Sequence, residues 1–410
     1  EAGYGTYMSG KWHVTRHFHE PKHNWPCQRG FDAFFGILTG ACSFFQPNTL
    51  TRDNEQIEPP PGPFFLTDAI SDEAATQIRR HAEKRPVQPF FQYVAYTAPH
   101  WPLHAHPEDV ARYHGRFDRG WDFLRQERLE RLIAMGIIHP DWRLSPRDPT
   151  QPPWGEAQDK EWQARRMEVY AAQIDRMDRG IGRILEALRE TGQWDNTVIL
   201  FLADNGGCAE EIQAHWEEWL MPDNAHPRTP DGSRVQFGND PQIMPGGADT
   251  YQSYGVPWAN LSNSPFREYK HWVHEGGIAT PFIAHWPDGI RDGGSLRREP
   301  AQLPDIMATC IELAKAEYPE TYNGRKIIPL EGFSMVPIFQ GNAFVRPALV
   351  WEHEGNAAVR EGRWKLVRKY PGDWELYDMA ADRTELNDLS ADHRQQLSLI
   401  HISEPTRPTT

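Results

Sequence analysis

The first residues that could do chemistry are a lysine and a histidine close to the start of the sequence. Lys11 and His13 stand in the segment Gly10-Lys11-Trp12-His13. In an extended strand alternate side chains share a face, so both would project into one pocket while Trp12 points the other way. An ammonium group suits sulfate or phosphate oxygens, and an imidazole exchanges a proton near neutral pH. The alternative is a surface lysine beside a core tryptophan.

A second histidine, His100, lies in residues 97–103 (TAPHWPL), directly after an apolar run. Pro99 and Pro102 restrict the backbone on either side and would hold the imidazole at the end of a strand, as a general acid requires. Because the sequence contains 18 histidines, a purely structural histidine is the competing interpretation.

Hard oxygen donors follow a later apolar run. Asp204 and Asn205 precede Gly206 and Gly207, directly after residues 197–203 (TVILFLA). Carboxylate and amide oxygens are the ligands that Ca²⁺ and Mg²⁺ prefer, and two glycines let the backbone turn tightly beside an ion. The alternative is a plain turn after a strand.

A second candidate cation comes further along the chain. Lys270 follows residues 264–267 (SPFR) and precedes the segment Glu275-Gly276-Gly277. The paired glycines predict a backbone turn before another strand. A surface lysine is the alternative here.

The elements that must position these residues alternate between helix and strand. Apolar spacings of three and four predict helices over residues 70–82, 167–188 and 303–314, and short apolar runs predict strands over 4–9, 90–96, 197–203 and 282–286. This alternation is typical of an α/β fold, in which polar groups at the carboxyl ends of parallel strands form ligand sites. Gly180 and Gly182 lie inside a predicted helix, where each costs about 1 kcal/mol relative to Ala, so we expect close backbone packing at both.

The last part of the sequence has a different pattern. From about residue 348, short β segments alternate with turn residues, which predicts a small antiparallel sheet. We therefore expect a main domain over residues 1–345 and a C-terminal β subdomain over 346–396. Residues 222–265 are rich in Pro, Gly, Asn and Asp and predict a long loop.

Composition excludes some classes of function. A formal net charge of −14 argues against a nucleic-acid partner, which would need a basic surface. The longest apolar run, residues 197–203, is too short to span a bilayer. The four cysteines, Cys27, Cys42, Cys208 and Cys310, have neither a disulfide framework nor zinc-site spacing.

Taken in order, the motifs GKWH, TAPHWPL, DNGG and SPFR…K…EGG resemble those of the type I sulfatases, bacterial arylsulfatase-like members of the alkaline-phosphatase superfamily. The resemblance covers about residues 3–390. It implies a doubly wound, mostly parallel sheet flanked by helices, one Ca²⁺ ion, and a formylglycine nucleophile made from Cys or Ser in a Cys/Ser-x-Pro-x-Arg motif. The implied substrate is a small-molecule or carbohydrate sulfate ester.

The resemblance also implies roles for individual residues. Asp204 and Asn205 would bind calcium, Lys11 and Lys270 would clamp the sulfate, His13 would hydrogen-bond the hydrated aldehyde, and His100 would be the general acid. None of the four cysteines lies in the nucleophile motif, and the family's paired N-terminal Asp ligands are not found. Both normally precede the GKWH segment, so we expect that they belong upstream of Glu1 and that the chain as given is inactive.

Both ends of the sequence carry further expectations. Residues 397–410 begin with LSLIHISEPTR, which resembles the translated end of a sequencing adapter, so we expect this tail to make few contacts. Export to the periplasm or the cell exterior is common in the family and is expected for the full-length protein.

Two other functions stay open at this point. A phosphoester or phosphonate hydrolase of the same superfamily would use a similar metal and nucleophile. A noncatalytic carbohydrate-binding protein would use the 16 tryptophans as stacking platforms.

Overall fold

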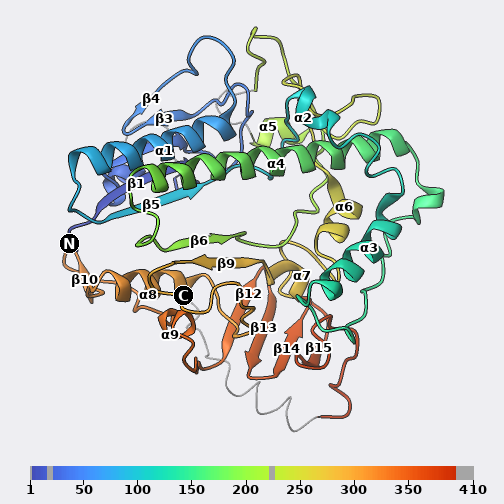
Figure 1. Ribbon diagram of the computed structural model, residues 1–410. Coiled ribbons are helices and arrows are strands. Elements are labelled where there is room, and N and C mark those ends of the chain that lie inside the picture. The colour runs from blue at the N-terminus through green and yellow to red at the C-terminus, as the bar shows by residue number, and fades with distance from the viewer. Residues whose placement is uncertain (1, 16–21, 221–226, 394–410) are drawn as a thin grey trace.

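The computed structural model describes residues 2–15, 22–220 and 227–393. Its largest sheet has five strands in the order β4-β3-β2-β1-β5 (Figure 1). β1 lies between β2 and β5 and runs parallel to both, whereas β3 and β4 extend the β2 edge in antiparallel fashion. The five strands are β1 (Gly5–Lys11), β2 (Ala33–Ile37), β3 (Leu50–Arg52), β4 (Glu55–Gln56) and β5 (Phe90–Ala95).

Alternate residues of β1 and β2 pack on opposite faces of this sheet, as the pleat of a strand requires. Met8 and Phe34 lie in one cluster with Trp25 and Leu38. On the other face the hydroxyl of Ser9 donates to the carbonyl of Ile70 at 2.8 Å. Both faces are therefore covered, and the carboxyl end of β1 emerges from a well-packed centre.

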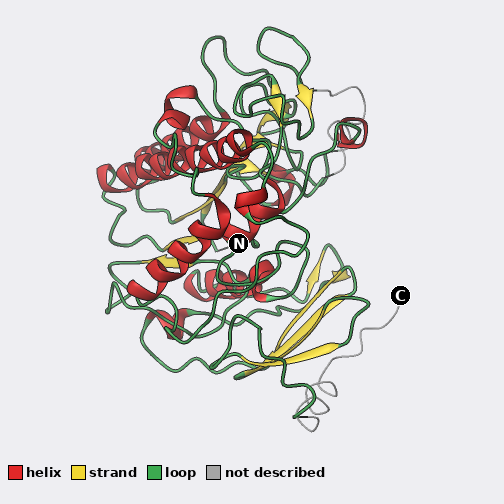
Figure 2. Ribbon diagram, turned by 90° about the vertical axis from the view of Figure 1, so that its right-hand side faces the viewer, coloured by secondary structure: helices red, strands yellow, loops and turns green. Residues whose placement is uncertain are grey.

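Two long helices form a layer over the second face. α1 (Leu66–Lys84) and α4 (Lys160–Glu190) lie side by side (Figures 1 and 2). Their contact includes an apolar cluster, with Ala74 and Ile78 of α1 against Ile184 and Leu188 of α4, and ion pairs such as Arg176–Asp68 also join the two helices. These helices confirm the two longest predicted periodic segments.

The two glycines of α4 differ in their surroundings. A Cβ on Gly180 would lie 2.1 Å from the Ser71 Oγ of α1, so the close packing predicted there is confirmed. A Cβ on Gly182 would meet nothing within 4 Å. The same prediction was wrong for Gly182, because that residue lies on a side of the helix without a close neighbour.

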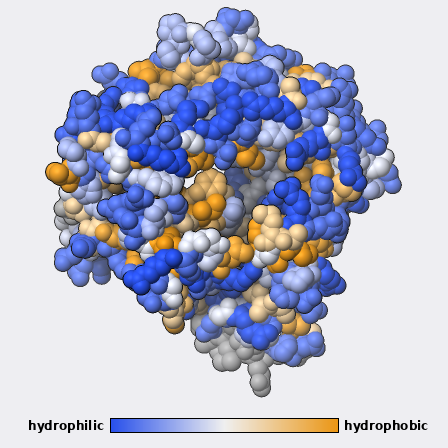
Figure 3. All heavy atoms as spheres, viewed as in Figure 1, coloured by the Kyte–Doolittle hydropathy of each residue, from blue (hydrophilic) through white to orange (hydrophobic). Residues whose placement is uncertain are grey.

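The strand that precedes the DNGG segment does not join the five-stranded sheet. β6 (Ile199–Leu202) pairs with β9 (Phe282–His285) in a separate antiparallel pair. Phe201 and Phe282 are correspondingly 37% and 40% exposed, whereas a central strand would bury them. The space-filling view is hollowed near its centre between the helical layer and these lower strands (Figure 3).

A second sheet closes the lower part of the molecule (Figures 1 and 2). It is antiparallel in the order β12-β13-β14-β15, as predicted from the pattern after residue 348. One face packs on Val273, in the segment that follows Lys270. Its strands are β12 (Leu349–His353), β13 (Asn356–Glu361), β14 (Trp364–Arg368) and β15 (Trp374–Asp378).

Shorter elements complete the described chain: η1 (Pro26–Arg29), α2 (Pro107–Ala111), α3 (Gly120–Ala134), η2 (Trp154–Glu156), α5 (Trp216–Leu220), β7 (Gln236–Phe237), β8 (Thr250–Tyr251), α6 (Gly255–Ser262), α7 (Glu275–Ile278), α8 (Pro304–Leu313), β10 (Thr321–Tyr322), β11 (Arg325–Lys326) and α9 (Val336–Phe339). In Figure 1 the strands β1, β5, β6 and β9 lie between α1 and α4 above and α8 below. The predicted α/β class with a small C-terminal antiparallel sheet is confirmed. The boundary at residue 345 stays a prediction, and the predicted tail at 397–410 lies outside the described residues.

Of the helices in the described ranges, none has both the length and the apolar character that crossing a bilayer requires.

Candidate active site

Two lysines from distant parts of the chain lie within electrostatic reach of each other. Lys11 ends β1, and Lys270 lies in the loop between α6 and α7. Burial lowers the pKa of the Lys11 ammonium, Asp204 opposes this change, and Lys270 adds to it. Two neighbouring ammonium groups form a local cationic site in a protein of net charge −14. Such a site attracts an anion.

His13 joins the lysines by a route that the sequence did not predict. β1 ends at Lys11, and His13 has a left-handed backbone conformation, with φ of 52°. The premise of one extended segment was therefore wrong. The imidazole lies against the backbone of Gly40, where a Cβ would come within 2.4 Å of Nε2. Burial and then the charges of Lys11 and Lys270 lower the pKa of His13, so the turned chain still brings it to the lysines.

His100 lies at the same place, in the loop that follows β5. Its Nδ1 is 2.9 Å from the carbonyl oxygen of Trp101. A carbonyl only accepts, so Nδ1 carries the proton of the neutral ring. Burial and the nearby charge of Lys11 lower the pKa of His100 to about 3. The imidazole is therefore neutral at pH 7 in the ligand-free protein.

The DNGG turn is held by the segment that contains Glu275-Gly276-Gly277. The amide of Gly206 donates to the carbonyl of Gly277 at 2.9 Å, and the amide of Lys270 donates to the carbonyl of Gly207 at 3.2 Å. A Cβ on Gly206 would lie 1.8 Å from the carbonyl oxygen of Gly276. Only glycine permits this approach, which is why two glycine-rich motifs far apart in sequence dock backbone to backbone.

The same turn places Asp204 in front of the lysines. The Asp204 side chain is exposed, and its charge acts on Lys11 of β1 and on Tyr93 of β5. Asn205 follows on the same turn and is half-buried. The electrostatic effects among Lys11, His13, His100, Asp204 and Lys270 show that the fold brings these side chains near one another. Asn205 is next to Asp204 in the sequence.

Glu210 is a site residue that the sequence analysis missed. Its carboxylate is 3.5 Å from the Lys270 Nζ and accepts a hydrogen bond of 2.6 Å from the Trp101 indole. Burial works to raise the pKa of Glu210, but Lys270 and the bonds from Cys208 and Trp101 outweigh it and lower the pKa to about 2. No spacing pattern marks this residue, because it follows the DNGG turn in a segment without regular structure.

The donors on the DNGG turn fit a calcium ion in kind. Asp204 offers a carboxylate and Asn205 an amide carbonyl, both hard oxygen ligands. The Asp204 carboxylate is exposed, and its charge acts on Lys11. Two side chains account for part of the six to eight oxygens that Ca²⁺ takes in proteins.

A nucleophile is harder to place in the described chain. Burial raises the pKa of the Cys42 thiol well above its usual range and that of Cys208 to about 12, so both stay protonated thiols. None of the four cysteines lies in the formylglycine motif, but its serine form occurs at residues 403–407 (SEPTR). That segment lies outside the described residues.

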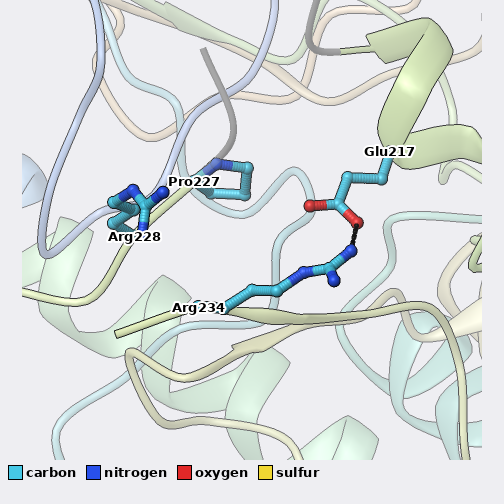
Figure 4. Close-up of a pocket in the computed structure, with 4 residues that line it drawn as sticks. All are labelled: Glu217, Pro227, Arg228 and Arg234. Carbon is cyan, nitrogen blue, oxygen red and sulfur yellow. Dashed lines mark hydrogen bonds and ion pairs between the residues drawn. The ribbon is translucent and has the colours of Figure 1, made fainter. Parts of the chain in front are cut away.

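A separate hollow of about 320 Å³ lies away from these residues and is lined by Glu217, Pro227, Arg228 and Arg234 (Figure 4). Arg234 there forms an ion pair with Glu217 at 2.8 Å. None of the six predicted site residues lines it.

The family follows from comparison with known proteins. A family model described as Sulfatase matches residues 1–316. The chain belongs to the sulfatase family. A second model, N-sulphoglucosamine sulphohydrolase, C-terminal, matches residues 267–404 of this sulfatase. The reaction class of this sulfatase is the hydrolysis of sulfate esters, so the predicted enzyme class is confirmed.

Individual relatives agree with this assignment. The sulfatase is 30% identical to an uncharacterized sulfatase of Schizosaccharomyces pombe over 96% of this chain and 72% of that protein. It is 32% identical to an arylsulfatase of Klebsiella aerogenes over 82% of this chain and 71% of that protein. The crystal structure of Ps i-CgsB shares the fold with a TM-score of 0.63 at 23% identity, over 97% of this chain and 70% of that one. A second structure of Ps i-CgsB holds k-i-k-neocarrahexaose.

Proposed function

We propose that this sulfatase binds the sulfate group of its substrate between Lys11 and Lys270, and that His13 and His100 donate and accept protons beside it. The observation that carries this proposal is that three distant segments bring both lysines close to both histidines, since the charges of Lys11 and Lys270 lower the pKa of His13 and of His100. Two neighbouring ammonium groups repel each other, and an anion bound between them would relieve that repulsion. In this arrangement the lysines stabilise negative charge that develops during ester cleavage.

The charge balance of the site favours a singly charged group. Two ammonium groups face the Glu210 carboxylate, 3.5 Å from Lys270 Nζ, and the Asp204 carboxylate beside Lys11. Apart from Asp204, which would bind the calcium ion proposed below, Lys11, Lys270 and Glu210 sum to one positive charge when both histidines are neutral. A sulfate monoester carries one negative charge, whereas a phosphate monoester carries two at slightly alkaline pH and would be repelled more by the Glu210 carboxylate.

His100 can serve as a general acid only after substrate binds. In the ligand-free protein its pKa of about 3 leaves Nε2 without a proton. A sulfate group between the lysines would cancel part of their charge and raise that pKa. Nε2 would then hold a proton for the leaving-group oxygen.

We further propose that Asp204 and Asn205 hold one Ca²⁺ ion and that the nucleophile is a formylglycine, as the family membership suggests. A calcium ion polarises sulfate oxygens when it is bound. A carbohydrate sulfate ester is the proposed substrate class, supported by the oligosaccharide bound to the structural relative Ps i-CgsB. An exported location stays a prediction.

Binding of two esters with one leaving group tests this proposal. An aryl sulfate and the corresponding aryl phosphate are titrated calorimetrically into the protein in calcium buffer at pH 8. We expect the sulfate ester to bind more tightly. Lys11→Ala and Lys270→Ala should each weaken it about tenfold or more, because each removes a charge-assisted contact of roughly 1.5–3 kcal/mol.

The matched control is Lys84→Ala, which removes an exposed lysine at the end of α1 and should leave binding unchanged. Tighter binding of the phosphate ester than of the sulfate ester would replace the proposal with a phosphoesterase. Equal affinity of the wild type and both site variants would show that the lysines do not form the sulfate site.

A further inference from the structure

Two histidines and a glutamate form a compact cluster beside the candidate active site. His271 follows Lys270, and His353 and Glu354 stand at the β12–β13 hairpin. Their nearest ligand atoms all lie within 4.8 Å of one another. All three side chains are reached by solvent, with 39%, 54% and 63% exposure respectively.

The spacing within the cluster matches the ligand shell of one tetrahedral ion. His271 Nδ1 is 3.3 Å from His353 Nε2 and 3.5 Å from Glu354 Oε2, and His353 Nε2 is 3.8 Å from Glu354 Oε1. Ligands bound to zinc at about 2.0–2.1 Å in a tetrahedron stand about 3.4 Å apart. The two imidazole nitrogens already stand at this separation, and each lies within 3.8 Å of one of the two Glu354 carboxylate oxygens, so a small rotation of the carboxylate would complete three corners of such a shell.

The other ring nitrogen of His271 has the partner that a metal-bound histidine requires. His271 Nε2 is 3.4 Å from Glu210 Oε1, on the opposite side of the ring from the cluster. Metal-ligating histidines usually donate this second N–H to a carboxylate, which fixes the ring and makes the ligating nitrogen more basic. Glu210 would supply this function while it also contacts Lys270.

A buried asparagine fixes the backbone on both sides of the cluster. Asn356 is 3% exposed, and its Nδ2 donates to the carbonyl of His353 at 2.9 Å and of His271 at 3.4 Å. This one amide holds together two segments 82 residues apart in sequence. It fixes the relative position of the two histidines.

Two of the three side chains also stand on strained backbone. His271 has φ of 87° and Glu354 has φ of 53°. The hairpin turn at Glu354-Gly355, where Gly355 has φ of 83°, favours Asn or Asp at its first position. Non-glycine residues held in this region cost of order 1–3 kcal/mol and cluster at functional sites.

We propose that His271, His353 and Glu354 bind one Zn²⁺ ion, with Glu210 as the positioning residue for His271. Two imidazoles and a carboxylate are a ligand set that suits zinc, and three protein ligands leave a fourth coordination position for water or a substrate oxygen. This site is distinct from the calcium site on the DNGG turn, since calcium takes oxygen ligands only. It goes beyond the proposed function and does not depend on it.

A second group of three, His100, Cys208 and Glu210, is also close enough to share an ion. It is the weaker candidate, because zinc binds the thiolate and burial raises the pKa of Cys208 to about 12. The Glu210 carboxylate there is already engaged by Trp101 and Lys270.

Zinc titration against a chromophoric chelator tests the proposal. The protein is first stripped of metal and returned to millimolar Ca²⁺, so that oxygen sites are filled. We expect one Zn²⁺ per chain. His353→Ala and Glu354→Gln should weaken zinc binding at least tenfold, and Glu210→Gln should weaken it about 10–100-fold, because His271 would lose the charged carboxylate acceptor that makes its ligating nitrogen more basic.

Two control variants separate the alternatives. His139→Ala removes an exposed histidine that lies 3.5 Å from Asp141 but has no third ligand, and it should leave zinc affinity unchanged. Cys208→Ser should also leave it unchanged. Loss of binding in Cys208→Ser would assign the ion to the group of His100, Cys208 and Glu210 instead. Equal affinity of wild type and the combined H271A/H353A/E354Q variant would likewise overturn the proposal. Circular dichroism of each variant verifies that the fold is retained.

Discussion

At the level of single side chains, the pKa of His100 is set by its burial and by two lysines contributed from elsewhere in the chain. Burial disfavours the charged imidazole, and Lys11 and then Lys270 add repulsion, while Glu210 acts in the opposite sense. The same lysines depress the pKa of His13. The protonation state of the site therefore depends on which charges it holds at a given moment.

Removal of Lys11 should raise the pKa of His100. In Lys11→Ala we expect the pKa of His100 to rise from about 3 but to remain below the ordinary pKa of histidine, because the ring stays buried. The direction follows from the sign of the interaction, since loss of a positive neighbour favours the imidazolium. Histidine NMR signals followed over pH give the measurement, with Lys84→Ala as the control. An unchanged or lower midpoint would show that Lys11 does not act on the ring.

At the level of elements, the α1–α4 layer owes its closeness to one glycine. Gly180 faces Ser71 of α1, whose hydroxyl is 2.9 Å from the carbonyl of Thr67 and 2.7 Å from the hydroxyl of Tyr96. These bonds fix the serine in place, so it cannot move aside for a larger neighbour. Gly182, two residues further along α4, has open space instead.

The two glycines should respond oppositely to the same substitution. Gly180→Ala should lower the free energy of unfolding by about 1–3 kcal/mol, since the added methyl group overlaps Ser71. Gly182→Ala should raise it by up to about 1 kcal/mol, because alanine favours the helix and meets no obstacle. Urea unfolding measures both. A similar sign for the two variants would contradict this description of the helix interface.

At the level of the whole molecule, the C-terminal sheet holds the loop that carries Lys270. Lys365 of β14 is fully buried, with Nζ 2.9 Å from Glu275 Oε1 of α7 and 2.7 Å from Glu385 Oε1. Burial works to raise the pKa of Glu275, but the charges of Lys365 and Arg383 outweigh it and lower the pKa to about 2. Glu275 begins the EGG segment on which the DNGG turn docks.

Loss of the buried lysine should destabilise the protein strongly. Lys365→Met should cost roughly 3–5 kcal/mol, because the buried Glu385 carboxylate would lose its cation and Glu275 would keep only Arg383. Lys369→Met is the matched control, since Lys369 is 46% exposed and pairs with Glu268 on the surface, and it should cost at most about 1 kcal/mol. Thermal unfolding compares the two. Equal melting temperatures for both variants would mean that the ion pairs of Lys365 do not stabilise the contact between the C-terminal sheet and α7.

Much of this protein was determined by its sequence alone. Apolar periodicity identified α1, α4 and the four C-terminal strands, because helix and strand patterns are local properties of the chain. The order of the GKWH, TAPHWPL, DNGG and EGG segments also indicated the sulfatase family before any geometry was known. The roles of Lys11, His13, His100, Asp204, Asn205 and Lys270 stay predictions that only experiments on the site can test.

Only the tertiary structure decided how the side chains meet. It separated β6 from the parallel strands, turned His13 back toward Lys11, and added Glu210 to the site. It also brought His271 to His353 across 82 residues. These arrangements rest on long-range contacts between segments that carry no common pattern, and on a few glycines whose missing side chains allow backbones to touch. Periodicity along the chain reports which face of an element is buried, but it does not report which distant element covers that face.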